Sequence, residues 1–467
     1  LGETWGTPKI IRMPSSSNSN LEDDRYVAIL PSGLAKNNAC GASGMYLGEL
    51  EAHADEDSPG RIFGADINGG PIPIVDTAPD GVSIGTEVLS TPNGSDIANA
   101  IPASPIVITP DTAPNIPWRG AMVYINDLEG KITKINLSNN TKGFNNNGEL
   151  IDGVTSLYDQ TTLFRINGNE DNERYSYFGM DAGLGVSDGG FWLFGSTGNF
   201  TNLGSREDTI DNILYGVRDL HYPYWRHLNN STIPKAMSKG AGGDMVPNTN
   251  FLKLAHAGAN NTPFYVGSRD VASNTCVNVS GSGIGGGGIL SGEVTNNTDT
   301  AANATVGDGD AGNQGCPLPS EKTSWVIHLE QDASYQFEDI RTYRKASAPP
   351  TLFKGKVYFP IYQPPVGDGS LKCEQGNAFI CATDEECGIN ESAKLDTPDD
   401  LPGGVPDSAN NSCAYVRGGV LSELVAFSDN LFANVAGPSE DISTLFKVLS
   451  VPGDIITNKG GWRDSSF

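Results

Sequence analysis

The sequence reads FWLFGSTGN from Phe191 to Asn199 and ILYGVRD from Ile213 to Asp219, with a polar stretch rich in Asp, Arg and Ser between them. Both segments are short, rich in aromatic and branched apolar residues, and bounded by turn-forming residues, as β-strands are. We therefore predict two strands joined by a polar connection. The same arrangement recurs along the chain, so this pair decides the fold class.

Two further hairpins follow the same pattern. Val123–Asp127 leads through Leu128–Gly130 into Lys131–Leu137, and Phe353–Lys356 turns into Val357–Phe359. Gly130 and Gly355 suit the positive φ that tight hairpin turns demand. Irregular repetition of strand groups is typical of a β-propeller, which closes its sheets radially and leaves no long exposed edges. A propeller therefore fits better than a sandwich.

Composition supports an all-β chain of many short strands. The 467 residues include 57 Gly and 29 Pro, and 18% of them are charged. Apolar residues do not repeat at helical spacing over three turns, so we expect little helix. Length alone does not divide an all-β chain. We expect residues 1–467 to form one propeller domain, with insertions at about 276–316 and 387–413.

Charge and hydropathy exclude several partners. The net charge of −26 disfavours nucleic acid, whose phosphates need clustered Lys and Arg. No apolar run approaches the roughly 18 to 20 residues that span a bilayer, so we expect no membrane span. The first 30 residues lack a basic and then apolar leader pattern. We expect a mature or partial chain, with a signal peptide and an upstream domain outside it.

Seven cysteines indicate disulfides rather than a metal site. They lie at positions 40, 276, 316, 373, 381, 387 and 413. We predict that Cys276 pairs with Cys316 and that Cys387 pairs with Cys413, because each bond would close the base of a long loop. If Cys373 pairs with Cys381, then Cys40 is left over. Zinc is the alternative, but the chain has no Cys-x-x-Cys pair and no His at ligand spacing. Disulfides would place the chain outside the cytosol.

Taken in order, these segments resemble the type IV pilus-associated tip adhesin and assembly factor family (PilC/PilY type). The opening Leu1–Ile10, the Tyr-x-x-Asp-x-x-Gly pattern from Tyr124 to Gly130 and the Phe-Gly to Leu-Tyr-Gly-Val-Arg-Asp pair carry the resemblance, followed by Trp325–Leu329, Pro350–Phe359 and Leu424–Phe427. It implies the C-terminal domain of that family, a modified β-propeller of seven blades with disulfide-stapled loops. It also implies an extracellular, pilus-associated protein that promotes pilus biogenesis and adhesion, with pilin or minor pilins and a host or abiotic surface as partners.

Calcium is the cofactor that the resemblance implies. The segment equivalent to the family's calcium loop keeps only Asp111 and Asn115 as oxygen ligands, and its prolines disturb the tight loop that calcium needs. A second segment presents Asn167, Asn169, Asp171 and Glu173 at alternate positions, as a calcium loop would. It lacks the bidentate Glu at the twelfth position of an EF-hand, so a solvated turn is the alternative.

An aromatic cluster is the candidate contact surface. His221, Tyr222, Tyr224, Trp225 and His227 stand within seven residues and could form a platform for a glycan or a protein partner. Packing of a long loop onto the body of the fold is the alternative, since large aromatic side chains are usually buried.

No catalytic constellation is evident, and we expect no enzymatic activity. Gly81–Gly85 and Gly185–Gly189 match the nucleophile-elbow pattern, which works only at a strand-to-helix turn. A quinoprotein-type propeller dehydrogenase would need a pair of adjacent cysteines that the chain lacks. The stronger alternative to the pilus tip is a free-standing cell-surface propeller that binds a glycan or another partner.

Overall fold

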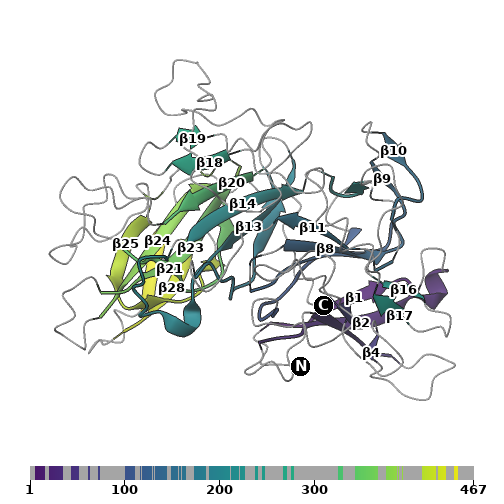
Figure 1. The fold of residues 1–467 in the computed structure, drawn as a ribbon, viewed down its shortest axis with the longest axis horizontal. Helices are drawn as coiled ribbons and strands as arrows, with labels where there is room; N and C mark the ends of the chain where they lie inside the picture. The colour runs from purple at the N-terminus through teal and green to yellow at the C-terminus, as the bar shows by residue number, and fades with distance from the viewer. Residues whose placement is uncertain are drawn as a thin grey trace.

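In the part of the chain that the computed structural model describes, nearly all of the regular secondary structure is β-strand (Figure 1). It describes residues 6–15, 20–34, 44–51, 62–63, 72–73, 100–110, 116, 118–128, 130, 132–144, 149–155, 157–158, 160–164, 173–185, 189–210, 212–219, 221–226, 237–239, 245–247, 267–270, 275–277, 324–329, 342–365, 375–386, 388, 392, 413–427, 430–437 and 446–450. Within these ranges the helical elements are the 3-10 turns η1 (Leu21–Asp23) and η4 (Phe200–Asn202). The predicted all-β class is confirmed.

Five sheets follow one another along the chain. The first sheet contains β1 (Lys9–Met13), β2 (Arg25–Pro31), β3 (Gly44–Glu49), β4 (Ile62–Phe63) and β5 (Ile72–Pro73). The second sheet contains β6 (Ile106–Ile108), β7 (Gly120–Asn126), β8 (Ile132–Ser138) and β11 (Gln160–Phe164). The third sheet contains β12 (Asp181–Leu184), β13 (Phe191–Ser196), β14 (Ile213–Asp219), β20 (Ser324–His328), β18 (Gly267–Asp270) and β19 (Thr275–Val277).

The chain continues into two more large sheets. The fourth sheet contains β21 (Lys345–Ala346), β22 (Thr351–Phe353), β23 (Lys356–Gln363), β24 (Asn377–Asp384) and β25 (Cys413–Gly418). The fifth sheet contains β26 (Val420–Leu421), β27 (Val425–Phe427), β28 (Asn430–Ala436) and β29 (Phe446–Ser450). Two small sheets accompany them, formed by β9 (Gly143–Phe144), β10 (Leu150–Ile151) and β15 (Trp225–Arg226), and by β16 (Met237–Lys239) and β17 (Met245–Pro247).

The predicted hairpins are antiparallel neighbours in these sheets. The FWLFGS segment is β13, and it pairs along its whole length with β14 in the register Phe191↔Asp219 to Ser196↔Leu214. β7 pairs with β8, and Gly130 in their connection has φ +85°. β22 pairs with β23 around Gly355, whose φ is +71°. All three predictions are confirmed, and the β7–β8 and β22–β23 turns show the positive φ expected of their glycines.

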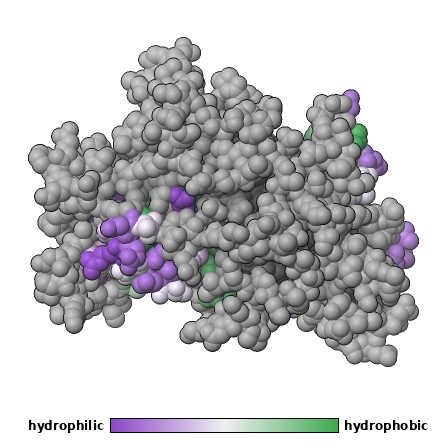
Figure 2. All heavy atoms as spheres, in the orientation of Figure 1, coloured by the Kyte–Doolittle hydropathy of each residue, from purple (hydrophilic) through white to green (hydrophobic). Residues whose placement is uncertain are grey.

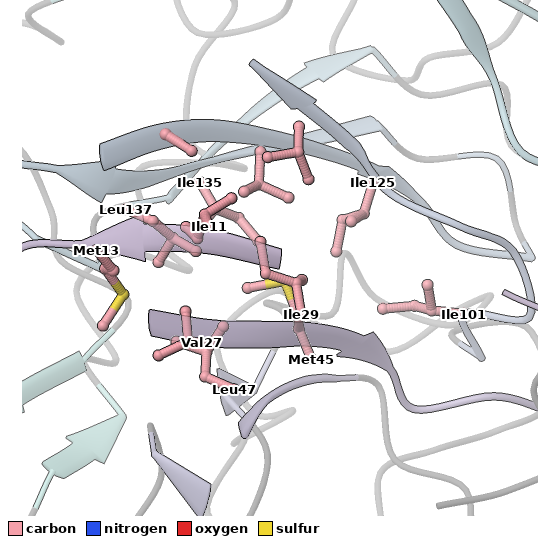
Figure 3. Packing of buried hydrophobic residues seen from close by; sticks show 13 residues of the cluster. Ile11, Met13, Val27, Ile29, Met45, Leu47, Ile101, Ile125, Ile135 and Leu137 are labelled. Atoms are coloured by element: carbon pink, nitrogen blue, oxygen red, sulfur yellow. The ribbon is translucent and has the colours of Figure 1, made fainter. Parts of the chain in front are cut away.

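Neighbouring sheets stack face to face in chain order. Alternate residues of a strand point to opposite faces, so β13 sends Phe191 and Leu193 toward the second sheet and Trp192 and Phe194 toward the fourth. β7 likewise sends Val123 into the cluster shared with the first sheet, which Figure 3 shows from close by. A further apolar cluster joins the fourth and fifth sheets. The second, third and fourth sheets are therefore buried on both faces.

The disulfide pattern differs from the prediction. Cys413 is bonded to Cys381, not to Cys387. The reason is the sheet register: Cys381 and Cys413 are direct partners on the antiparallel strands β24 and β25, and both side chains lie in the apolar cluster between the third and fourth sheets. The pairing excludes a Cys373–Cys381 bond as well. Cys40, Cys316, Cys373 and Cys387 lie outside the described residues, as does the side chain of Cys276.

None of the helices in the described ranges has the length and apolarity that crossing a bilayer requires.

Candidate functional site

The aromatic segment predicted as a contact surface folds at the junction of the second and third sheets. It begins where β14 ends at Asp219, turns through residues 221–224, and continues as β15, which pairs in parallel with β9. Within the turn the Tyr224 N–H donates to the His221 carbonyl at 2.6 Å. Because β9 follows β8 closely in the chain, this pairing ties the segment to the second sheet.

Ring contacts hold the segment against β13 of the third sheet and against β9 of the small sheet. Tyr222 stacks on Phe191 of β13 with ring centroids 4.7 Å apart, and Phe144 of β9 lies 5.9 Å from His221 and 6.0 Å from Tyr224. Trp225 is only 1% exposed. His221, Tyr222 and Tyr224 are half-buried, so part of each residue remains at the surface.

The five residues of the predicted platform are thus divided. Trp225 belongs to the packed interior, while His221, Tyr222 and Tyr224 lie together at its edge. His227 lies outside the described residues. The structure shows that part of this segment packs onto the sheets, and a binding role for the rest stays a prediction.

Beneath the segment lies a buried ion pair that the sequence reasoning missed. The Lys134 ammonium of β8 donates to Asp219 Oδ2 of β14 at 2.6 Å, and both side chains are 1% exposed. Lys134 Nζ also donates to the Tyr224 carbonyl at 2.7 Å. Tyr124 of β7 donates its hydroxyl to the same Asp219 Oδ2 at 2.8 Å. The pair therefore joins two sheets and the aromatic segment.

Aromatic rings enclose this pair. Lys134 Nζ lies 5.1 Å from the centroid of Trp225 and 5.8 Å from that of Tyr124. Burial lowers the pKa of Lys134, against the attraction of Asp219. Burial alone would raise the pKa of Asp219, but the Lys134 ammonium and the hydrogen bonds that the carboxylate accepts hold it below its usual value. Burial, reinforced by Asp219, raises the pKa of Tyr124 well above its usual value.

One of the predicted calcium ligands is described, and its surroundings are those of an internal contact. Glu173 Oε1 accepts a hydrogen bond from Ser205 Oγ at 3.0 Å, and Oε2 lies 4.0 Å from the buried Lys345 ammonium. An ammonium group beside a carboxylate competes with a metal ion for it. These contacts therefore do not favour calcium at Glu173.

The remaining candidate ligands Asp111, Asn115, Asn167, Asn169 and Asp171 lie outside the described residues. Among the residues that are described, no three His, Cys, Asp or Glu side chains come together as a metal centre. Calcium binding stays a prediction.

The viewed surface carries an apolar area over the β9–β10 hairpin. Figure 2 shows this area where Figure 1 places β10. In β10, Leu150 is 45% exposed and Ile151 is 37% exposed. β10 pairs only with β9 among the described strands, so this hairpin presents two exposed apolar side chains and a strand edge close to the aromatic segment.

Comparison with known proteins gives a weak likeness among solved structures. No family model matches the chain, and no curated protein matches it. Among solved structures, the fold is similar to the crystal structure of the Pseudomonas aeruginosa PilY1 C-terminal domain, with 12% sequence identity and a TM-score of 0.41. The match covers 97% of this chain and 72% of that chain. A likeness of this size does not by itself assign the chain to a family.

Proposed function

We propose that this chain is an extracellular, non-enzymatic pilus-tip adhesin and pilus biogenesis factor. The five stacked sheets would be blades of a modified β-propeller. The observation that carries the proposal is that the described parts of the segments resembling the tip adhesin family fall on strands and turns of successive sheets, in chain order. They are not scattered over unrelated loops.

The motif residues have structural roles that explain their spacing. In the Tyr-x-x-Asp-x-x-Gly pattern, the Gly130 N–H donates to the Asp127 carbonyl at 2.9 Å and so closes the β7–β8 turn. In the Phe-Gly and Leu-Tyr-Gly patterns, Gly195 pairs with Tyr215 and Gly216 pairs with Trp325. A side chain at either glycine would overlap the aromatic ring of its partner. The glycines therefore make room for rings that fill the junctions between sheets.

The proposed mechanism separates a rigid body from variable contact surfaces. Sheets buried on both faces resist deformation, because each strand packs against two neighbouring sheets. Contacts with pilin or minor pilins, or with a host or abiotic surface, would be made by edge strands and insertions. The half-buried rings of His221, Tyr222 and Tyr224 are the described part of that surface.

The first test is biochemical fractionation of the native cells. Pili are sheared from the surface, and the chain is quantified by immunoblot and located by tip labelling. Recovery at a few copies per filament, at filament ends, supports the proposal. Absence from pili together with presence on the cell envelope would favour the free-standing glycan- or partner-binding propeller instead.

A variant pair tests the aromatic segment. His221→Ala combined with Tyr224→Ala removes two half-buried rings at the junction, and Tyr26→Ala removes a 42% exposed ring from the first sheet as the control. We expect the double variant to lower recovery with pili while its melting temperature stays within a few degrees of the wild type. Equal recovery of the two variants would remove the segment from the contact surface.

A further inference from the structure

Lys134 and Asp219 hold an amine and a carboxyl group in direct contact inside the protein. Nζ lies 2.6 Å from Oδ2, and because Oδ2 is bonded to Cγ, the nitrogen also lies within contact reach of the carboxyl carbon. Positioning of this kind converts a bimolecular reaction into an intramolecular one with a very high effective concentration. The two residues are 85 positions apart and lie on different sheets.

The reaction runs through the uncharged forms of the two groups. Both side chains are 1% exposed, and the rings of Tyr124 and Trp225 stand beside the ammonium. Burying two charges is unfavourable, and a proton transfer along the hydrogen bond would remove both charges at once. The resulting amine is a nucleophile and the resulting carboxylic acid an electrophile, in a site from which water is excluded.

We propose that Lys134 and Asp219 form an intramolecular isopeptide bond that links β8 of the second sheet to β14 of the third. The ammonium first passes a proton to the carboxylate. The lone pair of Nζ then attacks Cγ, the C–OH bond breaks, and the hydroxyl leaves as water with a proton from the nitrogen. The ion pair thus becomes an amide and one water molecule, and neither an oxidant nor a co-reactant is needed.

Tyr124 is placed to assist the departure of the hydroxyl. Its OH donates to Asp219 Oδ2 at 2.8 Å, so it touches the oxygen that must be protonated and lost. A raised pKa, which burial gives this phenol, keeps it in the proton-bearing form. Tyr124 therefore acts as a hydrogen-bond donor to the leaving group.

A second buried lysine supplies an internal comparison. Lys345 is fully buried, but its Nζ donates to the Ser205 carbonyl at 2.7 Å and lies 4.0 Å from Glu173 Oε2. Its ammonium group donates to a backbone carbonyl and makes no close hydrogen bond to the carboxylate of Glu173. Burial alone therefore does not prepare a lysine for condensation, and no bond is expected there.

Tryptic mapping of the full chain tests the proposal directly. The chain is reduced, alkylated and digested, and the peptides are sequenced by mass spectrometry. We expect residues 132–142 joined to residues 219–226, one water lighter than the sum of the two peptides, with cleavage after Lys134 blocked by the amide. Stoichiometric recovery of residues 219–226 as a free peptide would overturn the proposal and leave an ordinary ion pair.

Three variants separate the bond from the fold. Lys134→Arg keeps the cation but removes the amine, so its reduced intact mass should equal the sequence value, while Lys345→Arg should remain one water lighter. Tyr124→Phe keeps both reactants, and in a time course after cell-free synthesis its linked fraction should rise about 10²-fold more slowly, as for loss of a general acid. Linkage at the wild-type rate would overturn the role given to Tyr124. If Lys134→Arg does not fold, the wild-type peptide map still decides.

Discussion

Replacement of Gly216 by Ala should destabilise the junction of the third and fourth sheets. Gly216 lies in the middle of β14, directly opposite Trp325 on β20. A methyl group built at Gly216 would fall on the indole ring, 2.8 Å from Cζ2 and closer still to Cε2 and Nε1. Ordinary contacts between carbon atoms are about 3.5–4.0 Å, so either the ring or the strand must move.

The indole has little room to move. It is 2% exposed, its centroid lies 6.3 Å from that of Phe194 and 6.2 Å from that of Phe359, and its Nε1 donates to the Glu385 carbonyl at 2.9 Å. Overpacking a core typically costs about 1–3 kcal/mol. Loss of the indole hydrogen bond adds about 1 kcal/mol. We therefore expect the free energy of unfolding to fall by about 2–4 kcal/mol.

Urea denaturation followed by tryptophan fluorescence measures this loss. With an m value of about 3 kcal/mol/M, the midpoint should fall by roughly 0.7–1.3 M. Gly204→Ala is the matched control, because Gly204 is exposed and a methyl group there meets nothing within 4 Å. If Gly216→Ala and Gly204→Ala give the same midpoint, the explanation of the motif glycine as space for the Trp325 ring is wrong.

Other perturbations probe different parts of the molecule. Cys413→Ser should lower the free energy of unfolding by about 2–4 kcal/mol through loss of the bond to Cys381, whereas Cys387→Ser should leave that bond intact in a non-reducing peptide map. Burial raises the pKa of Asp181 to about 6, although the N–H groups of Leu352 and Ala182 donate hydrogen bonds to its carboxylate and lower the pKa. Between about pH 6 and 4 the carboxyl group is therefore protonated in the folded state and ionised in the unfolded chain. As the pH falls through 6, the urea midpoint of the wild type should rise relative to that of Asp181→Asn. A difference between the two midpoints that does not change with pH would contradict this. If calcium binds at the segment ending in Glu173, millimolar calcium should raise the melting temperature of the wild type and not of Asp171→Ala; an equal rise in both would place the ion elsewhere.

Local turn chemistry made the hairpins predictable from sequence. Gly130 and Gly355 sit between apolar runs of strand length, and both adopt the positive φ that this placement indicates. The paired segments around Gly195 and Gly216 are likewise bounded by turn residues. Each of these predictions needed information from only a few neighbouring positions.

Contacts between distant strands were not predictable in the same way. The cysteines that flank a loop need not close it, because β24 continues to Asp384 and carries Cys381 inside the strand, opposite Cys413. The position of Lys134 did indicate a buried charge, because Lys134 shares a buried face of β8 with Ile132. A lysine on a buried face requires an anion nearby, but its identity depends on how the second and third sheets stack.

The pairing of β14 with β20 has a consequence for how such a chain can change over time. The two strands are adjacent in the third sheet, yet residues 220–323 separate them in sequence. The entropy of closing a loop grows only logarithmically, by about 0.6 kcal/mol for each doubling of its length. Added sequence at this point therefore costs the fold little once the strands are joined. Natural variation in length should concentrate here, and the same position offers protein engineers an entry point for grafting a foreign module onto an intact body.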